Sequence, residues 1–193
     1  MKISIEEIST DLLKEYDFIP QTVEVKSILQ PELVQGGLGG IILREVTVEP
    51  PYIKDYGAEG DLPSDVVKKF DVSKWGFFLG RAGSQPVGGA MVAFDTTGVF
   101  MLEARHDLAV LWDIRVCPEW KGTGISLFRH AADWARQRGC VQLKIETQNV
   151  NVPACRFYHR MGARLGEIHR FGYAGVPHVA HEVMLNWYLD LRE

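Results

Sequence analysis

The chain has 193 residues, of which 46% are hydrophobic and 24% are charged, with a formal net charge of −4. This composition is ordinary for a globular protein, and the length suffices for one domain with a substantial core. Because the charge is weakly negative and no basic block stands out, nucleic acid is excluded as a main partner. No apolar run reaches membrane-spanning length and no signal peptide is evident, so a cytoplasmic protein without a membrane partner is expected.

Residues 1–9 alternate polar and apolar positions, as a strand does. In chain order, the predicted elements are a strand at 1–9, a short helix at 10–16, and strands at 22–29 and 40–49, joined by the glycine-rich connector 36–40. Pro50 and Pro51 are expected to end the last of these strands, because proline cannot donate to a strand ladder.

The middle of the chain is first polar and loop-like and then has the pattern of two strands. Residues 52–75 are polar and predict a loop with one helical turn near 65–70. Residues 75–81 and 86–94 then predict a β-hairpin around Gly83, Ser84 and Gln85.

The second half predicts alternating strands and helices. These are a strand at 109–116, a helix at 124–137, a strand at 141–146, a helix at 153–161, and strands at 164–169 and 183–189 separated by a turn at 174–177. On the longer helix, one broad apolar face is expected to contain Ile125, Phe128, Ala131, Ala132 and Ala135. The order indicates an α/β layer architecture, and we expect one domain spanning 1–193.

Cysteine usage argues against a covalent or metal-bound framework. Cys117, Cys140 and Cys155 are odd in number and form no Cys-x-x-Cys pair, so neither a disulfide scaffold nor a metal site is expected. A reducing compartment fits this pattern.

The most informative segment, Cys117 to Ser126, joins a predicted strand to a helix through Gly122 and Gly124. Backbone amides at a helix start lack helical partners and, together with the helix dipole, favour a phosphate. A Walker loop is excluded because Lys121 precedes the glycines, and a dinucleotide fingerprint is excluded because Leu127 occupies the third glycine position. Taken alone, the segment fits either a phosphate site or a plain tight turn.

Two motifs together carry a family resemblance. The first, Val-x-Pro-x-x-Lys-Gly-x-Gly, starts at Val116, and the second, Asn-Val-Pro-Ala-Cys-Arg-Phe-Tyr-His-Arg-Met-Gly-Ala, starts at Asn151. They resemble the pyrophosphate-binding motif and the Asn-x-x-Ala-x-x-Phe-Tyr segment of the GNAT N-acetyltransferase superfamily. The resemblance implies a single-domain α/β GNAT fold. Its mixed, mostly antiparallel sheet would be splayed at the cofactor strand and have helices on both faces, with the cofactor-binding core at about 108–166.

A weaker likeness to streptothricin-type acetyltransferases extends over most of the chain. It rests on Leu43-Arg44-Glu45-Val46 followed by Pro50-Pro51 and Lys54, on Asp113-Ile114, on the run from Glu146 to Asn151, and on the closing Trp187-Tyr188. Three residues depart from these patterns. Lys121 replaces Arg or Gln, Ser126 replaces Gly or Ala, and Trp112 replaces an acidic residue.

The resemblance implies acetyl-CoA as the acetyl donor and assigns residues to it. By carry-over, Lys121 and the backbone of Gly122, Thr123, Gly124, Ile125 and Ser126 would hold the pyrophosphate. The backbone of Ile114 and Val116 would pair with the pantetheine arm, although both residues also fit a plain core strand. Asn151 would contact the same arm or cap the following helix.

The expected catalytic residues are Tyr158, Glu146 and Asp113. The resemblance implies that Tyr158 protonates the departing thiolate, a role that suits a phenol neutral at pH 7. Glu146 and Asp113 would attract a cationic amine and accept its proton, or else serve to orient loops and neutralise arginines. Without a matched histidine motif, a covalent acetyl-cysteine is not expected.

The expected activity is direct transfer of an acetyl group to a primary amine of a small cationic molecule, such as a streptothricin-like antibiotic. The alternatives are a peptide, protein or polyamine acetyltransferase and a catalytically weak CoA-binding module. The acceptor pocket would come from residues 52–72 and 95–107, which have no counterpart in the resemblance. A homodimer is compatible with the sequence, because no interface pattern fixes the oligomeric state.

Overall fold

The computed structural model describes residues 3–58 and 62–192, which form two compact units. The first unit contains residues 3–21, 56–58, 62–145 and 189–192, and the second contains 22–55 and 146–188. The expectation of one domain over 1–193 stays a prediction, and the predicted strand at 1–9 begins with two residues outside the described part.

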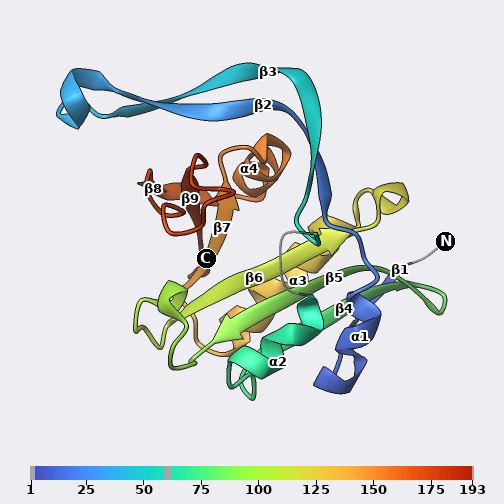
Figure 1. The fold of residues 1–193 in the computed structure, drawn as a ribbon. Coiled ribbons are helices and arrows are strands. Elements are labelled where there is room, and N and C mark those ends of the chain that lie inside the picture. Colours follow the sequence, from blue (N-terminus) through green and yellow to red (C-terminus); the bar gives the residue numbers. More distant parts are fainter. Residues whose placement is uncertain (1–2, 59–61, 193) are drawn as a thin grey trace. The chain divides into compact units, whose positions relative to one another are not determined.

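The first unit is built on a sheet whose strands are mostly antiparallel (Figure 1). In spatial order the strands are β1 (Ile3–Glu7), β4 (Gly76–Ala82), β5 (Gln85–Phe94), β6 (Leu108–Val116) and β7 (Gln142–Gln148), the last of which continues into the second unit. Only the β6–β7 pair of this set is parallel among the described strands. The mixed α/β sheet expected from the sequence is confirmed.

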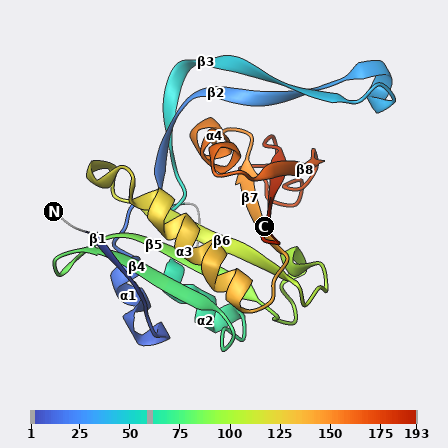
Figure 2. The ribbon, with the colours of Figure 1, turned by 180° about the vertical axis from the view of Figure 1, so that it is seen from behind.

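Helices cover both faces of this sheet, α1 and α2 on one and α3 on the other (Figures 1 and 2). The helical segments are η1 (Thr10–Leu12), α1 (Leu13–Tyr16), η3 (Pro63–Asp65), α2 (Val66–Lys69), η4 (Phe100–Leu102), η5 (Pro118–Trp120) and α3 (Thr123–Gln137). Two successive glycines of β5 make room for them. A Cβ on Gly88 would lie 3.0 Å from Leu127 of α3, and one on Gly89 would lie 2.5 Å from Tyr16 of α1. Because successive strand residues face opposite sides, both helices pack directly against the backbone of β5.

The buried face of α3 differs in one position from the predicted face. Phe128, Ala131, Ala132 and Ala135 are buried as expected, but Ile125 is 40% exposed. The interior positions next to them on the helix are taken by Leu127 and Trp134. The reason is geometric: residues 127, 128, 131, 134 and 135 follow the three- and four-residue spacing of one stripe, and residue 125 lies outside it.

The second unit contains a separate two-stranded sheet, a helix and one end of the main sheet. Its elements are β2 (Thr22–Leu33), η2 (Val34–Gly37), β3 (Ile41–Asp55), the end of β7, α4 (Val152–Arg160), β8 (Arg164–His169) and β9 (Met184–Asp190), with the strand order β7–β9–β8. Asn149 ties the sheets together, because its amide nitrogen donates to the carbonyl of Leu29 at 3.1 Å.

The expectation that Pro50 and Pro51 end a strand was wrong, because β3 continues to Asp55. The register explains the tolerance. Ser27 pairs with Thr47 and Val25 pairs with Tyr52, so four residues of β3 lie opposite the single residue between them on β2. Both prolines fall within this bulge, where no ladder hydrogen bond is required of them.

The other predicted elements appear near their expected positions, with shifts at their ends. The helix expected at 10–16 forms as a 3-10 turn followed by one α-helical turn, and β2 extends four residues beyond the predicted end at Leu29. The β4–β5 hairpin turns at Gly83, whose φ of +64° favours glycine. In the part of the chain that the structure describes, no helix is both long and apolar enough to cross a membrane.

Candidate active site

The glycine segment lies where β6 ends and α3 begins, within the first unit. After the short helix η5, Gly122 adopts a φ of +101° and forms the N-cap of α3. This left-handed conformation strains any residue with a Cβ, so glycine is required for the turn. The strand–turn–helix arrangement expected from the sequence is confirmed.

The start of α3 offers backbone amides to an anion. The first N–H groups of a helix have no carbonyl of the same helix to bind. At Ile125, however, the N–H donates to the carbonyl of Gly122 at 3.1 Å. Ser126 is the fourth helical residue, where the regular hydrogen-bond ladder begins. The amides of Gly122, Thr123 and Gly124 are therefore the best placed to meet an anion, and the five-amide cradle expected from the sequence stays a prediction.

The side chain of Thr123 fixes this helix start against the sheet. Thr123 is 3% exposed, and its methyl group would lie 3.2 Å and 3.3 Å from Cβ atoms added to Gly80 and Gly88. These two glycines are partners across β4 and β5. Because the Thr123 side chain faces the sheet, its contribution to an anion is limited to its backbone amide. Lys121, by contrast, is exposed and free to reach a phosphate.

The predicted cofactor strand, β6, pairs with β5 from Ala109 to Val116, with a register shift at Trp112, and with β7 over fewer residues. Ile114 pairs with Ala90 and Val116 with Gly88. The described register with β7 ends at the pair Leu111 and Ile145. Ile114 and Val116 are both partly buried, so the expectation that their side chains belong to the core is met in part.

Asp113 lies in β6 as predicted, but in a network of strong partners. Its carboxylate accepts hydrogen bonds from the Tyr16 hydroxyl at 2.5 Å and from the Arg115 guanidinium at 2.5 Å and 3.0 Å. Burial, followed by the charge of Asp113, raises the pKa of Tyr16 well above its ordinary value. The carboxylate of Asp113 already compensates the charge of Arg115, which fits the arginine-neutralising role that the sequence left open.

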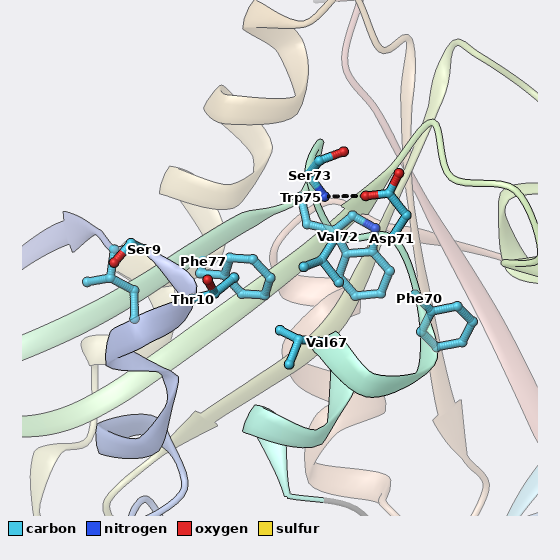
Figure 3. Close-up of a pocket in the computed structure, with 10 residues that line it drawn as sticks. Ser9, Thr10, Val67, Phe70, Asp71, Val72, Ser73, Trp75 and Phe77 are labelled. Atoms are coloured by element: carbon cyan, nitrogen blue, oxygen red, sulfur yellow. Dashed lines mark hydrogen bonds between the residues drawn. The ribbon is translucent and has the colours of Figure 1, made fainter.

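Two hollows lie in the first unit beside α2. Figure 3 shows the larger, of about 480 Å³, with Val67, Val72, Trp75 and Phe77 around it. The smaller, of about 180 Å³, is lined by Trp112, Asp113 and Arg115 of β6 together with Met91 and residues from 62 to 70. The predicted acceptor loop 52–72 therefore contributes to both hollows, whereas residues 95–107 line neither.

Trp112, which departs from the family pattern, belongs to an aromatic cluster at the smaller hollow. Its ring centroid lies 5.3 Å from that of Phe70 and 5.2 Å from that of Trp75. Such ring faces attract cations and apolar groups alike.

In the second unit, α4 carries two of the predicted residues. Asn151 caps this helix, since its side chain accepts a hydrogen bond from the Ala154 amide at 3.2 Å. The capping role left open by the sequence is therefore present. Tyr158 is 6% exposed, and its ring meets that of Phe157 edge to face at 5.5 Å.

Glu146, at the end of β7, has a partner that the sequence did not suggest. The hydroxyl of Tyr173 donates to its Oε1 at 2.7 Å. Burial, followed by the negative charge of Glu146, raises the pKa of Tyr173 above its ordinary value. Tyr173 therefore stays protonated and remains a donor near neutral pH. The partner described for Glu146 is thus a neutral phenol, whereas Asp113 is paired with a cation.

A buried ion pair lies in the same unit and was also missed. Lys54 Nζ is 2.5 Å from Glu182 Oε1, and the two side chains are only 4% and 3% exposed. The only signals in the sequence were the place of Lys54 in the resemblance and the charge of Glu182 just before an apolar strand. Neither signal indicates burial or pairing.

The three cysteines are poorly suited to act as nucleophiles at neutral pH. Burial raises the pKa of Cys140 to about 11 and that of Cys155 to about 12, and it also raises the pKa of Cys117. All three are free thiols. Within residues 3–58 and 62–192, no group of three His, Cys, Asp or Glu side chains is placed to hold a metal ion.

Comparisons with known proteins agree over nearly the whole chain. The acetyltransferase (GNAT) family matches residues 44–163. Streptothricin acetyltransferase from Escherichia coli is 30% identical over 193 residues, which cover 97% of this chain and 95% of that protein. The enzyme of the same name from Streptomyces lavendulae is 36% identical over 129 residues, covering 64% of this chain and 62% of that protein.

Solved structures show the same fold. The crystal structure of nourseothricin acetyltransferase has a TM-score of 0.77 at 22% identity, covering 99% of both chains. A putative streptothricin acetyltransferase from Bacillus anthracis str. Ames, solved in complex with acetyl coenzyme A, has a TM-score of 0.76 at 24% identity. This match covers 98% of this chain and 99% of that chain.

Proposed function

Because this chain belongs to the GNAT acetyltransferase family and uses acetyl-CoA as its donor, we propose that it acetylates a primary amine of a streptothricin-like antibiotic. The observation that carries the proposal is the 30% identity to the Escherichia coli streptothricin acetyltransferase over 97% of this chain. The three free cysteines fit a reducing compartment, and we place the enzyme in the cytoplasm.

The residues of the glycine segment fit the donor's pyrophosphate. Gly122, Thr123 and Gly124 present backbone amides at the positive end of the α3 dipole, and the exposed Lys121 adds a point charge. A phosphate needs close approach to backbone N–H groups, and the turn at Gly122 leaves that approach open, with no atom within 4 Å of a Cβ built there.

The proposed chemistry is direct transfer. The acceptor ammonium first loses a proton to the Glu146 carboxylate, which leaves a neutral amine. The amine nitrogen then attacks the thioester carbonyl, a C–N bond forms and the C–S bond breaks. The departing thiolate takes the proton of the Tyr158 hydroxyl, and the new amide nitrogen returns a proton to that oxygen. The net products are the acetylated amine, CoA thiol and one proton, which Glu146 releases to solvent.

The aromatic cluster in the first unit supports a cationic acceptor. Trp112 and Phe70 line the smaller hollow, and Trp75 packs against both of their rings. Cation–π attraction together with apolar contact would hold a cationic molecule there. Lys69 and Arg115 also line this hollow, so the rings rather than net charge would provide the attraction.

The test is thiol release from acetyl-CoA with a panel of streptothricin, a polyamine, a lysine peptide and a peptide N-terminus. We expect turnover with streptothricin at a kcat/KM at least tenfold above the other amines. Preference for a peptide or polyamine would reassign the acceptor. Calorimetry separates the remaining case, because tight CoA binding without turnover on any amine would indicate a binding module. Gly124→Val, which places a side chain at the amide cradle, serves as the variant with weakened donor binding.

A further inference from the structure

We propose that Tyr173 is a positioning residue that holds the Glu146 carboxylate in place to receive the acceptor's proton. This inference rests on the proposed function and adds a residue to it. Tyr173 lies between β8 and β9, 27 positions from Glu146 in the sequence, and its hydroxyl donates to Glu146 Oε1 at 2.7 Å.

The charges around Glu146 distinguish it from Asp113 and Glu182. Asp113 is bound by the guanidinium of Arg115, and Glu182 is bound by the ammonium of Lys54. A carboxylate that already neutralises a fixed cation attracts a second cation only weakly. Glu146 instead accepts from a neutral phenol, which orients one oxygen and leaves the negative charge available to an ammonium ion.

The segment that carries Tyr173 is fixed at both of its ends. At its start, Gly172 lies so close to β9 that an added Cβ would come within 2.9 Å of the Met184 Cβ. At its end, Val183 forms two hydrogen bonds with Asn149. The Asn149 amide donates to the Val183 carbonyl at 2.9 Å, and the Val183 amide donates to the Asn149 side-chain Oδ1 at 2.8 Å.

The Lys54–Glu182 ion pair holds the same end of this segment from the side of β3. Tyr173 itself is only 9% exposed. The phenol is therefore anchored by structure outside the reacting groups, as positioning of a proton acceptor requires.

The test is the pH dependence of kcat/KM for streptothricin in wild type and Tyr173→Phe. A hydrogen bond to the charged form of an acid favours that form, so its loss disfavours the ionised Glu146 needed for catalysis. We expect the acidic limb of the profile to move upward by about one pH unit, with CoA affinity unchanged. Phe171→Leu, at a 69% exposed position of the segment that carries Tyr173, is the control and should leave the profile in place.

A double-mutant cycle separates positioning from a general structural role. If Tyr173 acts through Glu146, Tyr173→Phe combined with Glu146→Gln should be no slower than Glu146→Gln alone. Multiplicative losses in the double variant, or an unchanged acidic limb in Tyr173→Phe, would overturn the inference while leaving the acetyltransferase function intact.

A second measurement requires neither turnover nor a Tyr173 variant. A buried hydroxyl proton bonded to a carboxylate should give a downfield proton NMR signal that exchanges slowly with water. That signal should move upfield in Glu146→Gln, because the charged acceptor is replaced by a neutral one. Spectra of wild type and Glu146→Gln without such a difference would overturn the inference. Absence of wild-type acetylation of every amine tested would instead count against the proposed function.

Discussion

Removing the cation of the buried Lys54–Glu182 pair should strongly destabilise the protein. In Lys54→Met, the carboxylate of Glu182 remains 3% exposed, and its Oε2 already lacks a hydrogen-bond partner within the described part of the chain. Breaking a buried pair on one side costs about 3–5 kcal/mol, because an uncompensated charge stays buried. For a chain of this size, a loss of about 4 kcal/mol lowers Tm by roughly 12 °C.

The double variant Lys54→Met/Glu182→Leu tests the cause. With both charges gone and apolar groups of similar volume in place, stability should return to within about 1 kcal/mol of wild type. The control is Lys26→Met in the exposed pair Lys26–Glu24, whose side chains are 67% and 51% exposed. It should cost less than about 1 kcal/mol.

The assay is unfolding by heat and by urea, followed by circular dichroism in all four proteins. The double variant should be about 3 kcal/mol more stable than Lys54→Met. The reasoning is refuted if Lys54→Met is as stable as Lys26→Met, or if the double variant is no more stable than Lys54→Met.

Three other predictions concern the packing of α3 against β5, the proton donor and the thiols. Gly88→Ala should lower the free energy of unfolding in urea by about 1–3 kcal/mol, because its Cβ would lie 3.0 Å from Leu127. Gly175→Ala is the control and should leave stability unchanged, since no atom lies within 4 Å of an added Cβ. Equal stabilities of the two variants would contradict the packing argument. Tyr158→Phe should lower kcat by about 100-fold with little change in CoA affinity, and a normal pH–rate profile in this variant would reassign the proton donor. Cys155 and Cys140, whose pKa values are raised to about 12 and about 11, carry little thiolate at pH 8. In the folded protein at pH 8 they should therefore react slowly with iodoacetamide, as followed by mass spectrometry, and they should react faster when the pH is raised or the protein is denatured. Rapid labelling of the folded protein at pH 8 would show that burial does not suppress the thiolates.

Local signals in the sequence were sufficient for the parts of the site that local geometry builds. The turn at Gly122 and the start of α3 depend on glycine conformation and on a 3.6-residue period, and both are legible in neighbouring residues. The cap at Asn151 is equally local, because the side chain binds an amide three residues ahead. The end of β3 was misjudged because the bulge that admits Pro50 and Pro51 depends on the register with another strand.

The partners of the acids were decided by tertiary structure. Asp113 and Glu146 look alike in the sequence, each as an acid at a predicted strand. Asp113 meets a tyrosine 97 positions away as well as its near neighbour Arg115, whereas Glu146 meets a tyrosine 27 positions away. Sequence patterns report the faces of single elements, and they carry no record of which distant side chains the folded chain brings within hydrogen-bond distance. The sequence by itself was sufficient to identify the family and the donor, and it predicts the phosphate cradle. The choice between a paired and an available carboxylate required the packed structure, because charge compensation acts over a few ångströms in space.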